Sequence, residues 1–263
     1  MKQAEISRQQ IIDAVAAGLP QEPYVLAVSL GGSDATGRTD AYSDIDLSVV
    51  VEDDRVEDAF ERMDAILEDL SPVEFRYRLP EPTWHGHSQV FARLRDADPH
   101  HFVDICVLRR SAPDRFVERE RHGEVKVLYD PENLMAPVDL DWEPHARKLH
   151  ARFTSIRETF LMFQALPIRA VARGFPAEAA YWYQSFTLKL FVELLRMRYC
   201  PERFDFGFRY LDRDLPPEVR EEVESLAFPR NADEVEQFRA RVEERVHQEW
   251  AAFDRGEWNL PAA

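Results

Sequence analysis

The fold is decided by two short segments, LGGS at residues 30–33 and SDIDL at residues 43–47. Each adjoins an apolar, β-branched run that is typical of a buried strand, YVLAVSL at 24–30 and IDLSVVVED at 45–53. The polar residues between these runs, 31–44, are rich in turn-forming types. We therefore expect two strands joined by a glycine-rich connection.

The two carboxylates of SDIDL predict a metal site. Side chains at positions i and i+2 of a strand point to the same face, so Asp44 and Asp46 lie side by side, roughly 6.5–7 Å apart at their Cα atoms. Neighbouring carboxylates repel each other unless a cation lies between them. Two carboxylates in this arrangement suit Mg²⁺, which would take oxygens of a substrate phosphate as further ligands. A bare D-x-D pair on a solvated edge strand is the plain alternative.

The glycines upstream of this pair predict a phosphate site. Gly31 and Gly32 let backbone N–H groups approach a phosphate closely, and the Ser33 hydroxyl adds a donor. A third carboxylate, Asp104, lies in the apolar run FVDIC, where an acid is unfavourable unless it has a partner. The alternative for Asp104 is a buried acid paired with an arginine. Phosphate-binding and metal-binding parts together are what phosphoryl or nucleotidyl transfer needs.

The remaining elements follow from periodicity. Residues 5–18 and 56–67 have the spacing of amphipathic helices, and we expect a short helix near 113–121. Further strands are expected at 73–79, 88–96, 101–110 and 125–130, with a hairpin at 97–100. From Asp141 onward the spacing is helical, with one long helix at 176–199 and two more at 216–227 and 232–254.

These elements predict an α+β fold: a mixed sheet with flanking helices, followed by an all-α helical bundle. The proline-containing segment 131–141 is the expected linker. We expect a first domain over residues 1–140 and a helical domain over residues 141–263.

Composition excludes several classes of protein. An apolar fraction of 45% argues against intrinsic disorder, and a net charge of −16 argues against nucleic acid as the main partner. Two cysteines are too few for a disulfide scaffold. The polar start MKQAEISRQQ and the lack of a long apolar run predict neither a signal peptide nor a membrane span. A cytoplasmic protein is expected.

The pattern GGS-x(10)-DID, with a later aspartate in an apolar strand, resembles the nucleotidyltransferase superfamily typified by DNA polymerase beta. An N-terminal domain of this kind followed by a helical bundle resembles the aminoglycoside and lincosamide nucleotidyltransferases. The resemblance implies that Asp44 and Asp46 bind two Mg²⁺ ions, and that Asp104 is a metal ligand or the general base. It also implies that Gly32 and Ser33 bind the triphosphate of ATP or another NTP.

The chain departs from the family at one position. Many relatives have arginine directly after the motif serine, where this chain has Asp34, so Arg38 is the candidate replacement for that phosphate contact. In the bundle, Lys189 is a lone cation among apolar neighbours, and the resemblance implies that it meets the triphosphate. Its alternative is a lysine that extends to the helix surface.

The expected activity is transfer of a nucleoside monophosphate, most simply AMP from ATP, to a hydroxyl of a small-molecule acceptor. An aminoglycoside-like antibiotic is the acceptor that the resemblance implies. The alternative function is modification of a protein or tRNA, as in toxin–antitoxin nucleotidyltransferases; a binding module without catalysis is a third. Three other features have plain explanations: His85 and His87 as polar or substrate-rim residues, Glu74 as an exposed strand residue, and the aromatic residues near Trp182 as bundle core.

Overall fold

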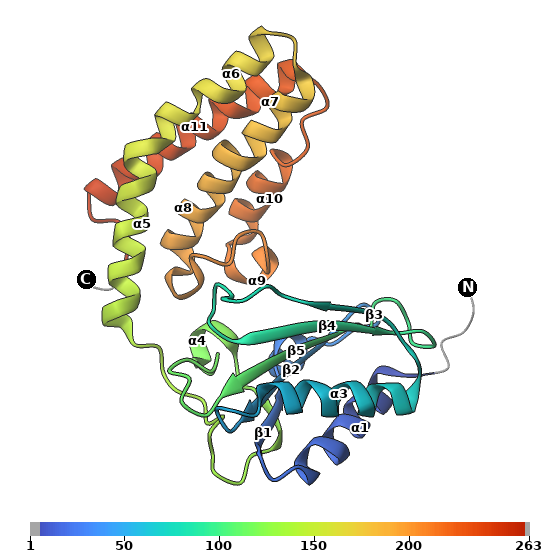
Figure 1. The fold of residues 1–263 in the computed structure, drawn as a ribbon. Coiled ribbons are helices and arrows are strands. Elements are labelled where there is room, and N and C mark those ends of the chain that lie inside the picture. Colours follow the sequence, from blue (N-terminus) through green and yellow to red (C-terminus); the bar gives the residue numbers. More distant parts are fainter. Residues whose placement is uncertain (1–5, 261–263) are drawn as a thin grey trace. The chain divides into compact units, whose positions relative to one another are not determined.

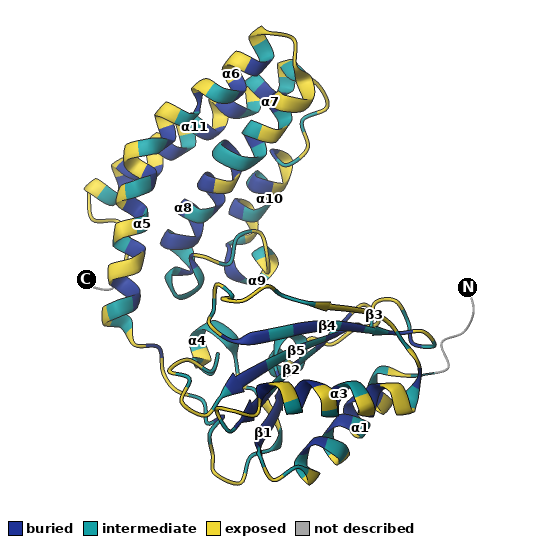
Figure 2. Cartoon of the chain, viewed as in Figure 1, coloured by how far each residue is buried: buried dark blue, intermediate teal, exposed yellow. Residues whose placement is uncertain are grey.

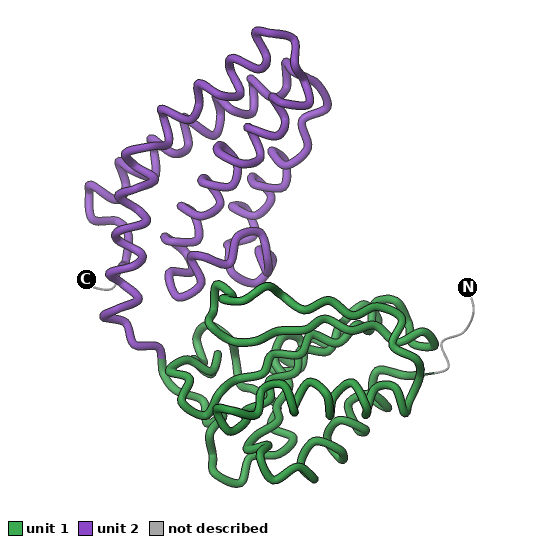
Figure 3. Tube along the Cα trace, viewed as in Figure 1, with its two compact units in different colours: residues 1–139 green, residues 140–263 purple. Residues whose placement is uncertain are grey.

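The computed structural model describes residues 6–260. Residues 1–5, which include part of the polar start and the first residue of the helix expected at 5–18, lie outside the described residues. Contacts within the chain divide it into two compact units, Met1–Asp139 and Leu140–Ala263 (Figure 3).

The first unit is built on a six-stranded mixed sheet with the strand order β3-β4-β5-β2-β1-β6 (Figure 1). Only β2 and β5 pair in parallel within this sheet; the other neighbours are antiparallel. The expected α+β architecture is thereby confirmed. The strands are β1 (Val25–Leu30), β2 (Ile45–Val51), β3 (Val73–Arg78), β4 (Ser88–Leu94), β5 (Val103–Arg109) and β6 (Lys126–Tyr129).

One face of this sheet is covered by α1 (Arg8–Gly18) and α3 (Val56–Leu70), which lie side by side (Figure 1). Ile11 and Val15 of α1 and Phe60 and Met63 of α3 lie in one apolar cluster with the strands. Buried and exposed residues alternate along α3, as its helical spacing predicts (Figure 2). Ser7 and Gln10 form a capping box that begins α1.

The opposite face of the sheet is covered only in part. A small apolar cluster, which includes Leu26, Val50, Leu108 and Met135, packs over one region of it. Elsewhere, alternate strand residues keep some exposure, among them Asp46 of β2, Asp104 of β5 and Phe91 of β4. We call this side the open face. Two short helices complete the unit, α2 (Gly32–Thr36) and α4 (Arg119–His122).

The second unit is helical, as expected. Its core gathers Phe160, Tyr183, Phe191 and Trp250 with many aliphatic residues. Its α-helices are α5 (Trp142–Phe163), α6 (Ala165–Ala172), α7 (Pro176–Trp182), α8 (Lys189–Tyr199), α9 (Leu211–Asp214), α10 (Pro217–Ser225) and α11 (Ala232–Asp254). Within residues 6–260, no helix is both long enough and apolar enough to cross a membrane.

The helix expected at 176–199 is not a continuous α-helix. Residues Tyr183–Leu188 form a π-helical segment between α7 and α8. A π-turn closes hydrogen bonds between residues five apart, so it brings Tyr183 and Leu188 toward the same side, and both are fully buried. Tyr183 donates a hydrogen bond to the carbonyl of Leu226 at 2.7 Å. Apolar spacing alone does not reveal such a widened turn.

Candidate active site

Three carboxylates meet on the open face. Asp46 of β2 pairs in register with Asp104 of β5, because Ile45 and Val103 begin the parallel ladder together. Asp44 lies two residues before Asp46, and the burial of Ser43, Ile45 and Leu47 puts both aspartates on the same side of the chain. The structure therefore brings Asp44, Asp46 and Asp104 to one end of the β2–β5 pair.

These carboxylates are hard to ionise together. Burial raises the pKa of Asp46 to about 7, and the negative charges of Asp44, Asp104 and Asp34 add to the effect. Burial likewise raises the pKa of Asp104 to about 6, against the lowering effect of a hydrogen bond from Gln89. The pKa of Asp44 is also raised, chiefly by burial. Because these partly buried carboxylates repel each other when ionised, a cation bound between them would stabilise their charged forms.

The glycine-rich turn packs directly on Asp46. The Gly31 N–H donates to the Asp46 carbonyl at 2.9 Å. Gly32 has a φ of +51°, and a Cβ placed on it would lie 1.8 Å from the Asp46 Oδ2 atom. Glycine is therefore needed at position 32 for both its backbone conformation and its space. The neighbouring Ser33 hydroxyl is buried and, within the described residues, has no hydrogen-bond partner.

Asp34, the departure from the family pattern, is neutralised by a residue that the sequence analysis missed. The Arg8 guanidinium of α1 forms an ion pair with the Asp34 carboxylate, and its Nε and Nη2 atoms donate to the Asp44 carbonyl at 3.0 and 2.9 Å. Lys126 of β6 lies 3.9 Å from Asp34. Arg8 thus ties α1 to the loop that carries the first aspartate. Nothing in the local sequence around Arg8 signals this contact.

Gln89 of β4 is a second residue that the sequence analysis missed. Its side-chain amide donates to Asp104 Oδ1 at 2.6 Å, and its Oε1 lies 2.9 Å from His85 Nε2. The His85 and His87 rings stack with their centroids 5.4 Å apart, and each has an edge contact with Phe116. His85 therefore belongs to a network behind Asp104 rather than to a separate histidine site.

Whether these residues suit Mg²⁺ depends on their donor chemistry. Over residues 6–260, no group of three or more His, Cys, Asp or Glu side chains has the geometry of a ready metal site. Asp44, Asp46 and Asp104 nevertheless supply the carboxylate oxygens that Mg²⁺ prefers, on a face where their charges repel each other. The residues present fit a divalent cation in type and charge.

The other candidate residues divide between the two units. Arg38 is exposed and follows α2, with its N–H bonded to the Ser33 carbonyl at 2.9 Å. Lys189 is exposed at the first residue of α8, in the second unit. Glu74 is paired with Arg93 at 2.9 Å, so it is already engaged. Tyr183 and Phe191 lie in the core of the helical bundle, as predicted for the aromatic residues near Trp182.

Comparisons with known proteins bear on the first unit. Residues 10–98, which include most of α1, the glycine-rich turn, Asp44 and Asp46, match the family model described as a nucleotidyltransferase domain. This chain contains a nucleotidyltransferase domain. The match confirms the predicted family and the predicted class of enzyme, one that transfers nucleotidyl groups. Asp104, helix α5 and everything beyond lie outside the matched part of the chain.

Solved structures similar to this chain include spectinomycin adenyltransferase AAD(9) from Enterococcus faecialis, solved with ATP and spectinomycin. That similarity has a TM-score of 0.38 and 13% identity, and it covers 89% of this chain and 99% of the other. JHP933 from Helicobacter pylori has a TM-score of 0.27 and 13% identity, over 93% and 95% of the two chains. These values carry no conclusion about substrate. No curated protein matches the chain significantly.

Proposed function

We propose that this protein transfers a nucleoside monophosphate, most simply AMP from ATP, to a hydroxyl of a small-molecule acceptor. The observation that carries the proposal is the close packing of Gly32 on the Asp46 carboxylate, beside the in-register pair of Asp46 and Asp104. A backbone turn open to phosphate oxygens thereby adjoins three carboxylates. The resemblance to aminoglycoside nucleotidyltransferases suggests an aminoglycoside as one acceptor to test.

The residues divide the work as follows. The Ser33 hydroxyl, which has no hydrogen-bond partner among the described residues, and the N–H groups of Gly32 and Ser33 donate to oxygens of the triphosphate. Asp44, Asp46 and Asp104 would hold Mg²⁺, which supplies positive charge against the negative charge that develops on the phosphate oxygens. Arg8 holds the Asp44 backbone in place, and Gln89 fixes the orientation of Asp104.

The reaction is an in-line displacement at the α-phosphorus. A bond forms between the acceptor oxygen and the α-phosphorus, the bond from that phosphorus to the bridging oxygen breaks, and pyrophosphate leaves. Asp104 is positioned to accept the proton of the acceptor hydroxyl when it is ionised. A carboxylate beside the acceptor oxygen is the group that general-base catalysis of this step needs.

The test follows pyrophosphate release with Mg²⁺, labelled NTPs and a panel of hydroxylated small molecules that includes aminoglycosides. We expect the Asp44→Asn/Asp46→Asn variant to lose at least 100-fold in turnover. Asp54→Asn/Asp69→Asn is the matched control, because it removes two exposed carboxylates and gives the same change in net charge. Chelation by EDTA should abolish turnover and added Mg²⁺ should restore it.

Two results would contradict the proposal. Full turnover in Asp44→Asn/Asp46→Asn would remove the carboxylates from the mechanism. Labelling of a protein or a tRNA, with no turnover of any small hydroxylated molecule, would replace the small-molecule acceptor by the toxin–antitoxin type of substrate.

A further inference from the structure

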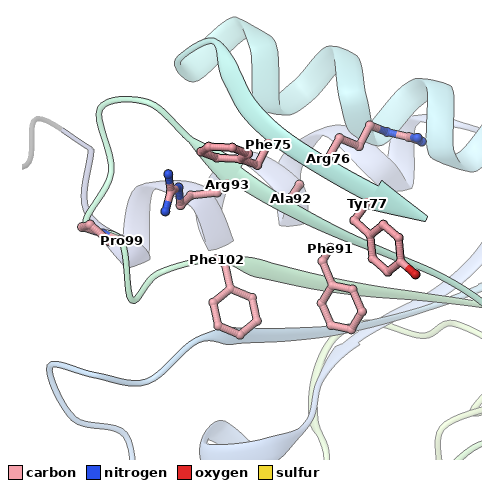
Figure 4. A pocket seen from close by; sticks show the side chains of 8 residues that line it. All are labelled: Phe75, Arg76, Tyr77, Phe91, Ala92, Arg93, Pro99 and Phe102. Atoms are coloured by element: carbon pink, nitrogen blue, oxygen red, sulfur yellow. The ribbon is translucent and has the colours of Figure 1, made fainter. Parts of the chain in front are cut away.

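An aromatic groove lies on the open face, beside the carboxylates. It has a volume of about 430 Å³, and Phe75 and Tyr77 of β3, Phe91 of β4 and Phe102 before β5 line it (Figure 4). This volume falls within the roughly 300–1,000 Å³ of typical small-molecule sites. Phe75 and Tyr77 are 59% and 57% exposed. Aromatic rings that remain this exposed side by side on a sheet are typical of a binding surface.

The groove is continuous with the candidate active site. Strand register places Phe91 opposite Asp104, and Tyr77 opposite Phe91. Directly paired residues share one face of a sheet, so Asp46, Asp104, Phe91 and Tyr77 form a single row across β2, β5, β4 and β3. The row passes from carboxylates to aromatic rings without a change of face.

The direction of the row identifies the side from which an acceptor arrives. The glycine-rich turn follows β1 and packs on Asp46, so the carboxylates lie between that turn and the groove. In an in-line displacement the attacking oxygen and the leaving group lie on opposite sides of the phosphorus. With the triphosphate at the turn, the acceptor hydroxyl approaches from the side of β5 and β4, where the groove begins.

The lining of the groove indicates the chemistry of the acceptor. Among the described residues that line it, the charged ones are two arginines, Arg76 and Arg93. The Arg93 guanidinium lies 4.3 Å from the centre of the Phe75 ring and is paired with Glu74, which leaves little net charge. Arg76 is paired with Asp64 and points away from the rings of Phe91 and Phe102 (Figure 4). No carboxylate lines the groove, although the chain as a whole is strongly acidic.

We propose that the aromatic groove binds the acceptor, and that this acceptor presents its hydroxyl from a flat, uncharged aromatic or fused-ring body. The inference rests on the proposed function, because it assigns the acceptor side of the same reaction. Flat rings stack on Phe75, Tyr77 and Phe91, and the hydroxyl extends toward Asp104. A polycationic acceptor finds no carboxylate in the groove.

Equilibrium binding of 2-naphthol and 7-hydroxycoumarin to the full chain tests the groove, with kanamycin as the polycationic comparison. We expect both ring compounds to bind, and Tyr77→Ala and Phe75→Ala each to weaken that binding about tenfold. Both side chains are more than half exposed, so these variants keep the fold. Phe228→Ala, which removes another exposed aromatic ring in the second unit, is the matched control and should bind as the unchanged chain does.

Binding of Mg²⁺–ATP, measured on the same variants, separates this inference from the proposed function. The groove variants should keep their affinity for Mg²⁺–ATP within twofold, whereas Asp44→Asn/Asp46→Asn should lose it and still bind 2-naphthol. If the unchanged chain binds 2-naphthol but does not bind Mg²⁺–ATP, the proposed function is overturned and the groove inference is not.

Three outcomes would overturn the groove as the acceptor site. The first is equal binding of both ring compounds by Tyr77→Ala and by the unchanged chain. The second is competition in which kanamycin displaces bound 2-naphthol at a lower concentration than 7-hydroxycoumarin does. The third is a dimer of the unchanged chain that Tyr77→Ala dissociates in sedimentation velocity, which would make the groove and the exposed edge of β3 a self-association surface.

Discussion

Gly32 lies so close to Asp46 that a single added carbon would collide with the carboxylate: a Cβ on Gly32 would lie 1.8 Å from Asp46 Oδ2. The turn and the carboxylate are therefore packed together, and the backbone of Gly31 and Gly32 fixes where Asp46 points. The hydrogen bond from the Gly31 N–H to the Asp46 carbonyl joins the two backbone segments at the same place.

Gly32→Ala should strongly weaken nucleotide binding while the chain still folds. The new methyl group must displace the Asp46 carboxylate, and the φ of +51° adds backbone strain of about 1 kcal/mol. We expect the affinity for Mg²⁺–ATP to fall at least 30-fold in a titration followed by calorimetry. Gly37→Ala is the matched control, because Gly37 has a φ of +66° and open space around its missing Cβ. Equal loss of affinity in both variants would show that strain, not the collision, is responsible.

The strands and the paired acids were predictable because their signals are local. Alternation around Ile45 and Leu47 assigns Asp44 and Asp46 to one face, and every strand expected in residues 24–130 is present. The register between β2 and β5, which brings Asp104 opposite Asp46, is not local: it depends on how residues 58 positions apart align. The apolar residues around Asp104 marked it as a candidate, but the sequence did not show that it lies opposite Asp46.

Arg8 and Gln89 were missed for the same physical reason. Arg8 reaches the Asp44 carbonyl across 36 residues of chain, and Gln89 reaches Asp104 across 15. Neither residue belongs to a recognisable motif, because Arg8 acts through the packing of α1 on the sheet and Gln89 through the pairing of β4 with β5. The interrupted helix at Tyr183–Leu188 is a comparable case, since apolar spacing does not distinguish a π-turn from an α-turn.

Gln89→Ala should lower kcat about tenfold and leave the KM for ATP nearly unchanged. The substitution removes the 2.6 Å hydrogen bond that orients Asp104, while the turn at Gly32 and Ser33 stays intact. Steady-state kinetics of pyrophosphate release measures both constants. Gln9→Ala is the control, because Gln9 is exposed on α1 and bonds only to Asp13 nearby. A raised KM for ATP with unchanged kcat would mean that Gln89 acts in nucleotide binding instead.

Arg8→Met should destabilise the first unit by about 1–3 kcal/mol, because it leaves the buried Asp34 carboxylate without its guanidinium partner. Adding Asp34→Asn to the same chain should recover part of that loss. Urea unfolding of the two single variants and the double variant gives the coupling energy between the residues. Strictly additive effects would contradict a direct stabilising contact. Turnover should stay low in the double variant, since the Asp44 carbonyl still lacks its donors.

Asp214 should control the acid stability of the second unit. Burial alone would raise the pKa of its carboxyl, but hydrogen bonds from Arg213, Arg203 and Arg196 outweigh burial and lower it to about 2. A lowered pKa in the folded state means that the carboxylate stabilises the fold above its ordinary pKa of about 4. That stabilisation is lost as the pH falls from about 4 to about 2.

Asp214→Asn should therefore cost about 3–5 kcal/mol at pH 7, because Arg196 has no exposed side-chain surface and loses its ion-pair partner at 2.5 Å. Tryptophan fluorescence during urea unfolding reports chiefly on this unit, which holds Trp142, Trp182, Trp250 and Trp258, whereas Trp84 lies in the first unit. Asp254→Asn is the control: its pair with Arg157 is exposed, and its removal should leave the unfolding midpoint nearly unchanged. The difference in stability between Asp214→Asn and the unchanged chain should shrink as the pH falls below 4. A constant difference down to pH 2 would contradict the ionised state assigned to Asp214.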